Sequence, residues 1–267
     1  MKIEASFQAI NKISQIADYL FGERSIRTIF EFGSRYGEDT IEFTKKYPAA
    51  IVYAFECNPG TIEICRQNLK QFPNIILNEK AVSDKIGSVS FFVNDKEKTK
   101  TAWEDGNQGA SSLFKASGKY PVEEYVQKEV IVNSITLSSF ISEEKIEEID
   151  IMWMDVQGAE LMALRGLENQ ISKIKLLHVE VEFFEIYKDQ PLFRDVNKFL
   201  KKNNFKLLGY TSYSEYAGDA VYLNRTFYNR YKVEQIKQNL LENRHEGFFK
   251  RICNFPARFS KALQKDR

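Results

Sequence analysis

The chain has 267 residues and a nearly balanced charge, with 38 Lys or Arg against 37 Asp or Glu. This length fits one large α/β domain or two small ones, and the balanced charge gives no indication of a nucleic-acid partner. The first residues have no apolar core of the signal-peptide type, and no apolar run is long enough to span a bilayer. Three cysteines without a CxxC pair suit a reducing compartment, so we expect a cytoplasmic protein.

The charge is distributed unevenly along the chain. Residues 225–267 hold eleven Lys or Arg and four Asp or Glu, a net charge of +7, so residues 1–224 carry a net charge of −6. This shift predicts a boundary near Asn224. We therefore expect a domain over residues 1–224, which begins with a helix within residues 1–23, and a basic helical tail over residues 225–267.

The predicted elements alternate between helices and strands. Apolar residues at spacings of three and four predict an amphipathic helix at the start of the chain. RTIFEF and AAIVYAFE are typical of strands, DTIEFTKKY and TIEICRQNLKQF of helices, and NIILNEKAVS and GSVSFFVN of two further strands. Residues 94–128 are polar and have no clear period, which is typical of a functional loop or a partly disordered segment.

The alternation resumes after this loop. VIVNSITLSSFI is followed by strand IDIMWMD, helix AELMALRGLENQI, strand KLLHVEVE and helix LFRDVNKFLKKN. FKLLGY and DAVYLN are then two strands joined by a short loop, so the last strand runs antiparallel to its neighbour. The pattern predicts a mostly parallel sheet with helices on both faces. A dinucleotide-binding fold is not expected to end in such a hairpin.

A glycine turn follows the first strand, in the stretch EFGSRYGED. It offers only Gly33 and Gly37, with the bulky Arg35 and Tyr36 between them. A pyrophosphate-binding loop uses more glycine, because the backbone must approach the phosphates closely. The turn is better suited to a ligand without phosphates, such as S-adenosylmethionine. An ordinary turn between a strand and a helix is the alternative.

A carboxylate at the end of the second strand supports the same ligand. Glu56 follows the turn by about twenty residues, where an acid can accept hydrogen bonds from both ribose hydroxyls. The alternative is a surface glutamate with no ligand.

From Thr28 to Asn224 the sequence resembles the FkbM family of S-adenosylmethionine-dependent methyltransferases. The matching stretches occur in the family's order: IFEFGSRYGEDT, VYAFECNP, LNEKAVSDKIGSVSFF, GASSLF, ITLSSFI, IDIMWMDVQGAELMALRG and LLHVEV. The resemblance implies a class I methyltransferase (Rossmann-like) α/β fold, with six parallel strands, an antiparallel seventh and helices on both faces. It also implies methyl transfer to oxygen, commonly to a hydroxyl of a sugar or natural product.

Five positions depart from the family pattern. Glu31 stands where Asp is frequent, Arg35 where Asn is common and Cys57 where Pro is common. Trp153 and Gln157 occupy places where Lys and Glu are frequent. These two lie close to the expected reaction centre, so they bear on the acceptor more than on the cofactor.

The resemblance also places the cofactor at the carboxyl ends of the strands. We assign Glu31 to the methionine amino group, Glu56 to the ribose and Asp84 to the adenine amino group. Ala81 and Val82 would line the adenine, with plain core packing as the alternative. The complete set of expected cofactor contacts is Glu31, Gly33, Ser34, Gly37, Thr40, Glu56, Asn58, Ala81, Val82, Asp84 and Asp155.

Three residues are candidates for the chemistry at the acceptor. Asp155 ends the fourth strand, and we predict it as the general base, because an alcohol is a poor nucleophile until its proton is leaving. Its alternative role is to cap the next helix. Period two in KLLHVEVE places His178, Glu180 and Glu182 on one face of a strand. Glu180 is expected near the substrate, and His178 is either a second candidate base or a hydrogen-bonded core histidine.

We expect no bound metal. No His or Cys cluster has the spacing of a zinc site. Asp155 and Glu180 together with substrate oxygens would satisfy Mg²⁺. However, a base and in-line positioning suffice when the sulfonium is already activated. Glu160 is interpreted as a favourable charge in the first turn of a helix.

Two loops are candidates for the acceptor side of the site. Tyr210, Tyr213 and Tyr216 could stack on sugar rings, or they could be exposed tyrosines without a role. The segment that contains Trp103 and GASSLF could close over the site as a lid and exclude water.

The basic tail has an amphipathic pattern. VEQIKQNLLENR predicts one helix. Beyond Gly247, apolar residues recur at spacings of three and four among basic residues, namely Phe248, Ile252, Phe255, Phe259 and Leu263. The pattern fits peripheral contact with an anionic surface, such as the inner face of the membrane. The alternative is that these side chains pack on the domain or on a second copy of the chain, as a homodimer.

The predicted function is an S-adenosylmethionine-dependent O-methyltransferase that acts on a hydroxyl, most simply of a sugar in a glycan or glycolipid, or of another small molecule. A nicotinamide-dependent dehydrogenase would need a third glycine in the turn. A nucleic-acid methyltransferase that acts on base amino groups would typically show Pro-Pro-aromatic after the fourth strand, and no nucleic-acid partner is expected. A non-catalytic protein with this fold is disfavoured, because Glu31, Gly33, Glu56 and Asp155 are retained.

Overall fold

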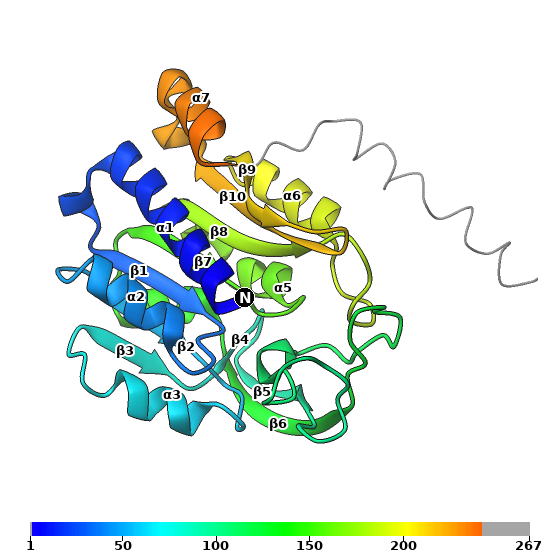
Figure 1. Cartoon of the computed structure of the whole chain (residues 1–267). Helices are drawn as coiled ribbons and strands as arrows, with labels where there is room; N and C mark the ends of the chain where they lie inside the picture. Colours follow the sequence, from blue (N-terminus) through cyan, green and yellow to red (C-terminus); the bar gives the residue numbers. More distant parts are fainter. Residues whose placement is uncertain (1, 242–267) are drawn as a thin grey trace, which may run out of the picture.

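The computed structural model describes residues 2–241, with side chains from residue 8 onward (Figure 1). The apolar repeat predicted beyond Gly247 lies outside the described residues and stays a prediction. None of the helices among the described residues combines the length and apolar character needed to cross a bilayer.

A seven-stranded sheet forms the centre of the molecule. Its order is β3-β2-β1-β7-β8-β10-β9, and the strands span Ile75–Asn78, Ile51–Phe55, Thr28–Phe32, Ile149–Met154, Ile174–Glu182, Ala217–Asn224 and Phe205–Tyr213 in that order. The first five are parallel, and β10 pairs antiparallel with both β8 and β9. Six strands therefore share one direction and β10 opposes them, which confirms the predicted class I methyltransferase sheet.

Helices cover both faces of this sheet (Figure 1). The face formed by the side chains of Ile29, Val52 and Ile151 packs against α1 and α2, and α3 packs against Ala54 nearby. The opposite face, which carries Phe30, packs against α4, α5 and α6. These helices span Lys2–Phe21, Glu38–Lys46, Ile62–Leu69, Leu137–Glu143, Glu160–Arg165 and Phe193–Lys202. Adjacent strand residues thus enter opposite cores, as expected for a strand buried on both faces.

A second sheet of three strands lies beside the first. Its order is β4-β6-β5, with bounds Ala81–Val82, Gln127–Ile135 and Gly87–Asn94. The sequence prediction that Ala81 and Val82 end the third strand is therefore wrong. The Asn78 side chain accepts a hydrogen bond from the Lys80 amide at 3.1 Å, and this local turn separates β3 from β4.

The segment between β5 and β6 is anchored at several points. A short 3₁₀ helix, η2 (Gln108–Ala110), lies in it, and isolated bridges tie Phe92 to Ser112 and Ala116 to Tyr187. It therefore has a fixed path over the carboxyl ends of the central strands.

The described part of the chain closes with α7 (Arg230–Asn239). The helix begins earlier than the predicted VEQIKQNLLENR, because the Asn229 side chain accepts a hydrogen bond from the Lys232 amide at 3.1 Å. Val233 and Ile236 are buried in the same core as Ile10 and Ile13 of α1. The residues just beyond Asn224 therefore pack on the domain.

Candidate functional site

A cavity of about 570 Å³ lies at the carboxyl ends of β1, β2 and β7. Several predicted cofactor residues line it: Gly33, Glu56, Asn58, Ala81, Val82 and Asp155. Side chains that the sequence analysis did not select also line it, among them Lys80, Phe91, Gln108 and Ser111. Phe91, Gln108 and Ser111 come from β5 and the segment that follows it. No local pattern in the sequence predicts that this segment packs onto the site.

The two glycines of the turn are explained by close packing of protein on protein. A Cβ on Gly33 would lie 1.9 Å from the Asp155 carbonyl oxygen, and one on Gly37 would lie 2.6 Å from Leu69 Cδ2. Both also have positive φ angles, 86° and 88°. The turn thus needs glycine at these two positions because α3 and the end of β7 lie so close to it. Neither glycine is needed to let a phosphate approach the backbone, which is consistent with a ligand that lacks phosphates.

Glu56 faces the cavity with its carboxylate already oriented. It accepts hydrogen bonds at 2.6 Å from the backbone amides of Arg35 and Asn58. Burial raises the pKa of Glu56 to about 7. The Thr61 side chain and the Cys57 backbone also contribute hydrogen bonds to it, so Glu56 stands at the cavity as a pre-oriented acceptor.

Glu31 lies beneath the turn and lines no cavity that we find in the described residues. Its carboxylate accepts hydrogen bonds from Ser34 Oγ and from Thr40 Oγ1, the latter at 2.7 Å. Burial raises the pKa of Glu31 to about 8. In this arrangement Glu31 orients Ser34, and its predicted contact with the methionine amino group remains a prediction.

The remaining predicted cofactor residues lie farther from the cavity. Gly37 and Thr40 are buried behind the turn. Asp84 is exposed to solvent, does not line the cavity and accepts a hydrogen bond from Ser83 Oγ at 3.4 Å. The structure thus brings Ala81 and Val82 to the predicted adenine position without Asp84.

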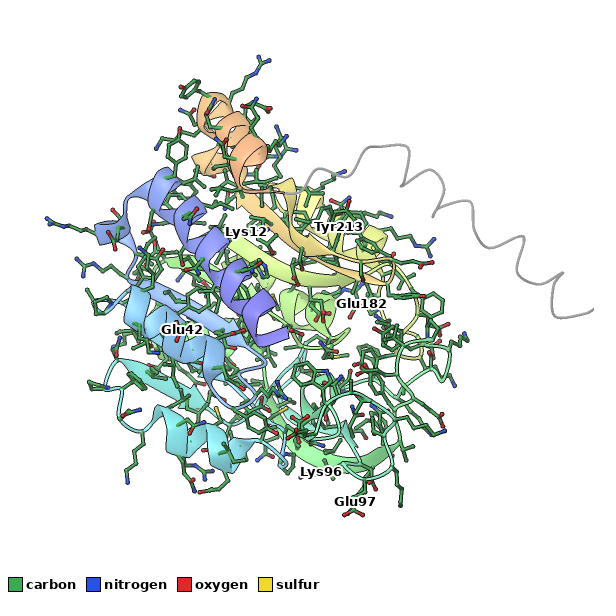
Figure 2. The ribbon with its side chains drawn as sticks, viewed as in Figure 1. Lys12, Glu42, Lys96, Glu97, Glu182 and Tyr213 are labelled. Atoms are coloured by element: carbon green, nitrogen blue, oxygen red, sulfur yellow. The ribbon has the colours of Figure 1, made fainter. Side chains whose placement is uncertain are left out.

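A second, more open cavity of about 1,410 Å³ adjoins the first. Both cavities are lined by Gly33, Arg35, Gly109, Asp155 and Gln157. Glu180, Glu182 and Asp219 line only the second cavity, from the ends of β8 and β10; Figure 2 labels Glu182 there. Asp155 therefore stands where the two cavities meet, as a residue between a cofactor and an acceptor must.

Gln157 joins two of these carboxylates. Its Nε2 donates hydrogen bonds to Asp155 Oδ1 at 2.5 Å and to Glu180 Oε2 at 2.7 Å. Tyr187 Oη lies 2.8 Å from both Gln157 Oε1 and the Ala110 carbonyl oxygen, and its one proton can be donated to either. In the sequence, Gln157 stands out only as a departure from the family pattern, and Tyr187 carries no signal of its own.

The helix after Asp155 is not capped by its side chain. Helix α5 begins at Glu160 without a side-chain cap, and Glu160 Oε1 accepts a hydrogen bond from the Val156 amide at 2.9 Å. Asp155 itself is exposed. The alternative role of Asp155 as a helix cap is therefore not what the structure shows.

His178 lies in the core behind Trp153. The two rings stack at 3.8 Å between centroids, and His178 Nε2 is 2.8 Å from Thr211 Oγ1. Burial lowers the pKa of His178 to about 3. His178 lines neither cavity. This geometry favours the core histidine of the two predicted alternatives over a base.

The tyrosines of the β9–β10 hairpin do not line the cavities. Tyr210 is buried, Tyr213 (labelled in Figure 2) is exposed, and Tyr216 packs edge-on against Tyr120 at 5.5 Å. The aromatic lining of the second cavity instead comes from Trp103, Tyr120, Tyr125 and Trp153. The hairpin tyrosines predicted to stack on an acceptor thus do not reach the cavities, and the aromatic rings that do come mostly from the segment between β5 and β6.

A clamp holds this segment over the turn. The Arg35 guanidinium pairs with Asp105 and lies 4.7 Å from the centre of the Trp103 ring. Tyr36 Oη donates to Asp105 at 3.0 Å, and burial raises the pKa of Tyr36 to about 12. Two residues of the glycine turn thus fasten the predicted lid, which we call the Asp105 clamp.

Three acids cluster at the end of β8 and the start of α5, with Glu160 and Glu182 buried and Glu180 half-buried. Carboxylate oxygens of Glu160, Glu180 and Glu182 lie within 4.8 Å of one another. Burial raises the pKa of all three, and for Glu180 and Glu182 the nearby carboxylates raise it further. The amide of Gln157 lies between Asp155 and Glu180, the pair considered for Mg²⁺ from the sequence.

Comparison with known proteins is consistent with this geometry. The methyltransferase FkbM domain model matches residues 31–207. The chain is 26% identical over 170 residues to the 2-O-methyltransferase NoeI of Sinorhizobium fredii, a match that covers 63% of this chain and 68% of NoeI. It is 23% identical over 148 residues to Methyltransferase 1 of Beauveria bassiana, which covers 53% and 59% of the two chains.

Among solved structures, methyltransferase FkbM from Methylobacillus flagellatus matches with a TM-score of 0.49 and 11% identity. That match covers 78% of this chain and 47% of the other, so the chain spans about half the length of that protein.

Proposed function

Because the chain belongs to the FkbM methyltransferase domain family, we propose that it transfers a methyl group from S-adenosylmethionine to a hydroxyl oxygen of a sugar. The observation that carries this proposal is the exposed carboxylate of Asp155, which lines both cavities. A group that removes the hydroxyl proton must reach the acceptor and lie beside the donor, and Asp155 meets both conditions.

The first cavity suits the cofactor in chemistry. Glu56 presents a pre-oriented carboxylate to ribose hydroxyls, while Ala81, Val82 and Phe91 offer an apolar surface for a base. When bound, S-adenosylmethionine supplies a methyl group that is already activated by a sulfonium.

The residues of the chain then have simple tasks. The acceptor hydroxyl oxygen forms a bond to the methyl carbon as the carbon–sulfur bond breaks, and Asp155 accepts the hydroxyl proton. Gln157 orients the Asp155 carboxylate, and the segment held by the Asp105 clamp limits the access of water. The products are a methyl ether, S-adenosylhomocysteine and a protonated Asp155 that returns its proton to solvent.

A sugar is supported by the second cavity. Trp103, Tyr120 and Tyr125 line the same cavity as the carboxylates of Glu180 and Glu182. Aromatic rings can stack on the apolar faces of sugars, while carboxylates accept hydrogen bonds from hydroxyls. The 2-O-methyltransferase named above agrees with transfer to oxygen.

Incubation with labelled S-adenosylmethionine and a panel of glycans tests the proposal. We expect a labelled product that gains the mass of one methylene group, with the methyl group on oxygen by tandem mass spectrometry. No product with the wild-type chain across glycans and free sugars, in protein that binds the cofactor, would contradict transfer to a sugar hydroxyl.

A further inference from the structure

The second cavity is strongly acidic on the side that faces the acceptor. Asp155, Glu180, Glu182 and Asp219 come from three neighbouring strands and line it together. Its lining includes one basic side chain among residues 8–241, Arg35, and that side chain pairs with Asp105 in the clamp. Acidic side chains therefore outnumber basic ones in the described lining of this cavity.

The cofactor does not account for this surplus. The acids that line the first cavity are Glu56 and Asp155, so these two face the positive charges of S-adenosylmethionine. Glu180 and Glu182 line only the second cavity, beyond Gln157. Their negative charge is balanced either by a proton or by a bound cation.

Among residues 8–241, no Lys or Arg forms an ion pair with Asp155, Glu180 or Glu182. Of these three acids Glu182 is buried, and buried acids are uncommon unless they are paired. Ionisation of Glu180 and Glu182 is unfavourable here, because burial and the nearby carboxylates raise the pKa of both side chains.

The orientation of Gln157 shows which chemistry this end of the cavity favours. Its NH₂ group, the positive end of the amide dipole, donates hydrogen bonds to both Asp155 and Glu180, while its carbonyl oxygen lies 2.8 Å from Tyr187 Oη. Hydrogen-bond donors are thus already placed between the acids. A protonated amine is the ligand group that offers several donors and a full positive charge.

Aromatic side chains line the same cavity. Trp103, Tyr120 and Tyr125, which we call the aromatic wall, come from the segment between β5 and β6, and Trp153 comes from β7. Faces of aromatic rings attract ammonium groups by about 0.5–2 kcal/mol, and the same faces stack on sugar rings. An anionic acceptor, such as a sugar phosphate or a uronic acid, would be repelled by four carboxylates at close range.

From this geometry we propose that the acceptor is a saccharide with a protonated amino group, which lies between the Glu180–Glu182 carboxylates and the aromatic wall. The proposal rests on the proposed function, because it concerns the acceptor of that reaction. It names a specificity that the family assignment does not contain. Glu180 and Glu182 would bind the ammonium, while Asp155 remains with the reacting hydroxyl.

Intrinsic fluorescence gives a direct binding test. The chain has two tryptophans, and both Trp103 and Trp153 line the second cavity. We would titrate protein saturated with S-adenosylhomocysteine with the trisaccharides of chitosan, chitin and cellulose. These share one backbone and carry an amine, an acetamide or a hydroxyl at the same carbon. The titrations are run at several pH values, because the amine must be protonated while Glu180 and Glu182 remain ionised.

We expect the chitosan trisaccharide to bind at least about tenfold more tightly than the other two, a difference of about 1.4 kcal/mol. In Glu182→Gln the ratio of the dissociation constants of the neutral and the amine trisaccharides should fall towards one. The control Glu42→Gln changes a carboxylate that pairs with Lys45 on α2, away from both cavities, and should keep the preference. Melting temperatures establish that both variants fold.

Two outcomes overturn the proposal. In the first, the chitosan trisaccharide binds no tighter than the chitin and cellulose trisaccharides. In the second, Glu182→Gln keeps the preference for the chitosan trisaccharide. A methylation assay on the same trisaccharides separates this proposal from the proposed function. Methyl transfer to cellulose trisaccharide at least as efficient as to the amine keeps the O-methyltransferase and removes the cationic acceptor. A binding preference for the amine with the methyl group on nitrogen keeps the cationic acceptor and removes transfer to oxygen.

Discussion

At the scale of single residues, Asp155 carries the chemistry that we propose. Asp155→Asn keeps the shape of the side chain but removes its ability to take a proton. We expect turnover to fall by roughly 10²–10⁴-fold, the usual contribution of a general base, with little change in affinity for S-adenosylmethionine. Single-turnover rates and cofactor titrations measure the two effects separately. A variant with turnover near that of the wild type would show that another group takes the proton.

Glu31 gives the ligand-free protein a stability that depends on pH. Burial raises its pKa from 4.5 to about 8. The folded protein therefore holds a proton that the unfolded chain has already lost between these values. This contribution is fully present below about pH 4.5 and is lost as the pH rises through about pH 8.

Glu31→Gln removes the group that titrates, so comparison of the wild type with this variant isolates the contribution of Glu31 to stability. From about pH 5 to about pH 8, the free energy of unfolding of the wild type should fall by about 2–4 kcal/mol relative to the variant. Urea denaturation at several pH values, with the same buffers for both proteins, measures the difference. A difference that does not change with pH would mean that Glu31 is ionised in the folded protein throughout.

Sequence reasoning reached some of these residues more easily than others. Glu56 and Asp155 follow strands directly, so the rule that ligands lie at carboxyl ends of parallel strands was enough to find them. Gln157 is two residues beyond Asp155, but its function depends on Tyr187 and Glu180, which only the folded chain brings near. Asp84 also comes after a predicted strand, so the same rule selected it. The turn after Asn78 redirects the chain, and Asp84 does not line the cavity.

At the scale of elements, the Asp105 clamp joins the glycine turn to the segment between β5 and β6. Asp105→Asn removes the charge that pairs with Arg35 at a site where both side chains are largely shielded from water. We expect a loss of about 1 kcal/mol, with cofactor affinity about fivefold weaker and faster proteolysis between β5 and β6. Calorimetry and limited proteolysis, with and without S-adenosylhomocysteine, measure both effects.

The same segment offers a matched control. Lys100 and Glu124 form an exposed ion pair there, so Glu124→Gln removes a charge of the same kind without touching the turn. Its effect should be close to zero. Equal effects of the two variants would argue against a specific clamp.

The strands and helices of the central sheet could be predicted from the sequence because their apolar patterns are local. The three-stranded sheet could not, since β4 has two residues and its pairing with β6 joins positions about fifty residues apart. The polarity of residues 94–128 was enough to predict a functional loop. Its attachment through Arg35 and Asp105 could not be predicted, because these residues are far apart in the sequence.

At the scale of the whole molecule, the basic tail remains a proposal drawn from the sequence. We propose that it contacts anionic membranes, and that a chain stopped at Glu246 loses this contact while it keeps α7 and the domain. Full-length protein should sediment with anionic liposomes at low salt, and much less at high salt or with neutral lipid. If neither chain sediments, a dimer interface is the alternative, and analytical ultracentrifugation of both chains tests it.

The position of β10 between β8 and β9 has a consequence for how the chain is made. Strand β8 ends at Glu182, but the neighbour that completes its pairing ends at Asn224. During synthesis, a ribosome must therefore add about forty more residues before that edge is covered, a delay of several seconds at ordinary elongation rates. In that interval the free edge of β8 can pair with other nascent chains. Protection by a chaperone would matter most in this window, and α1, made first, waits longest for its partner α7.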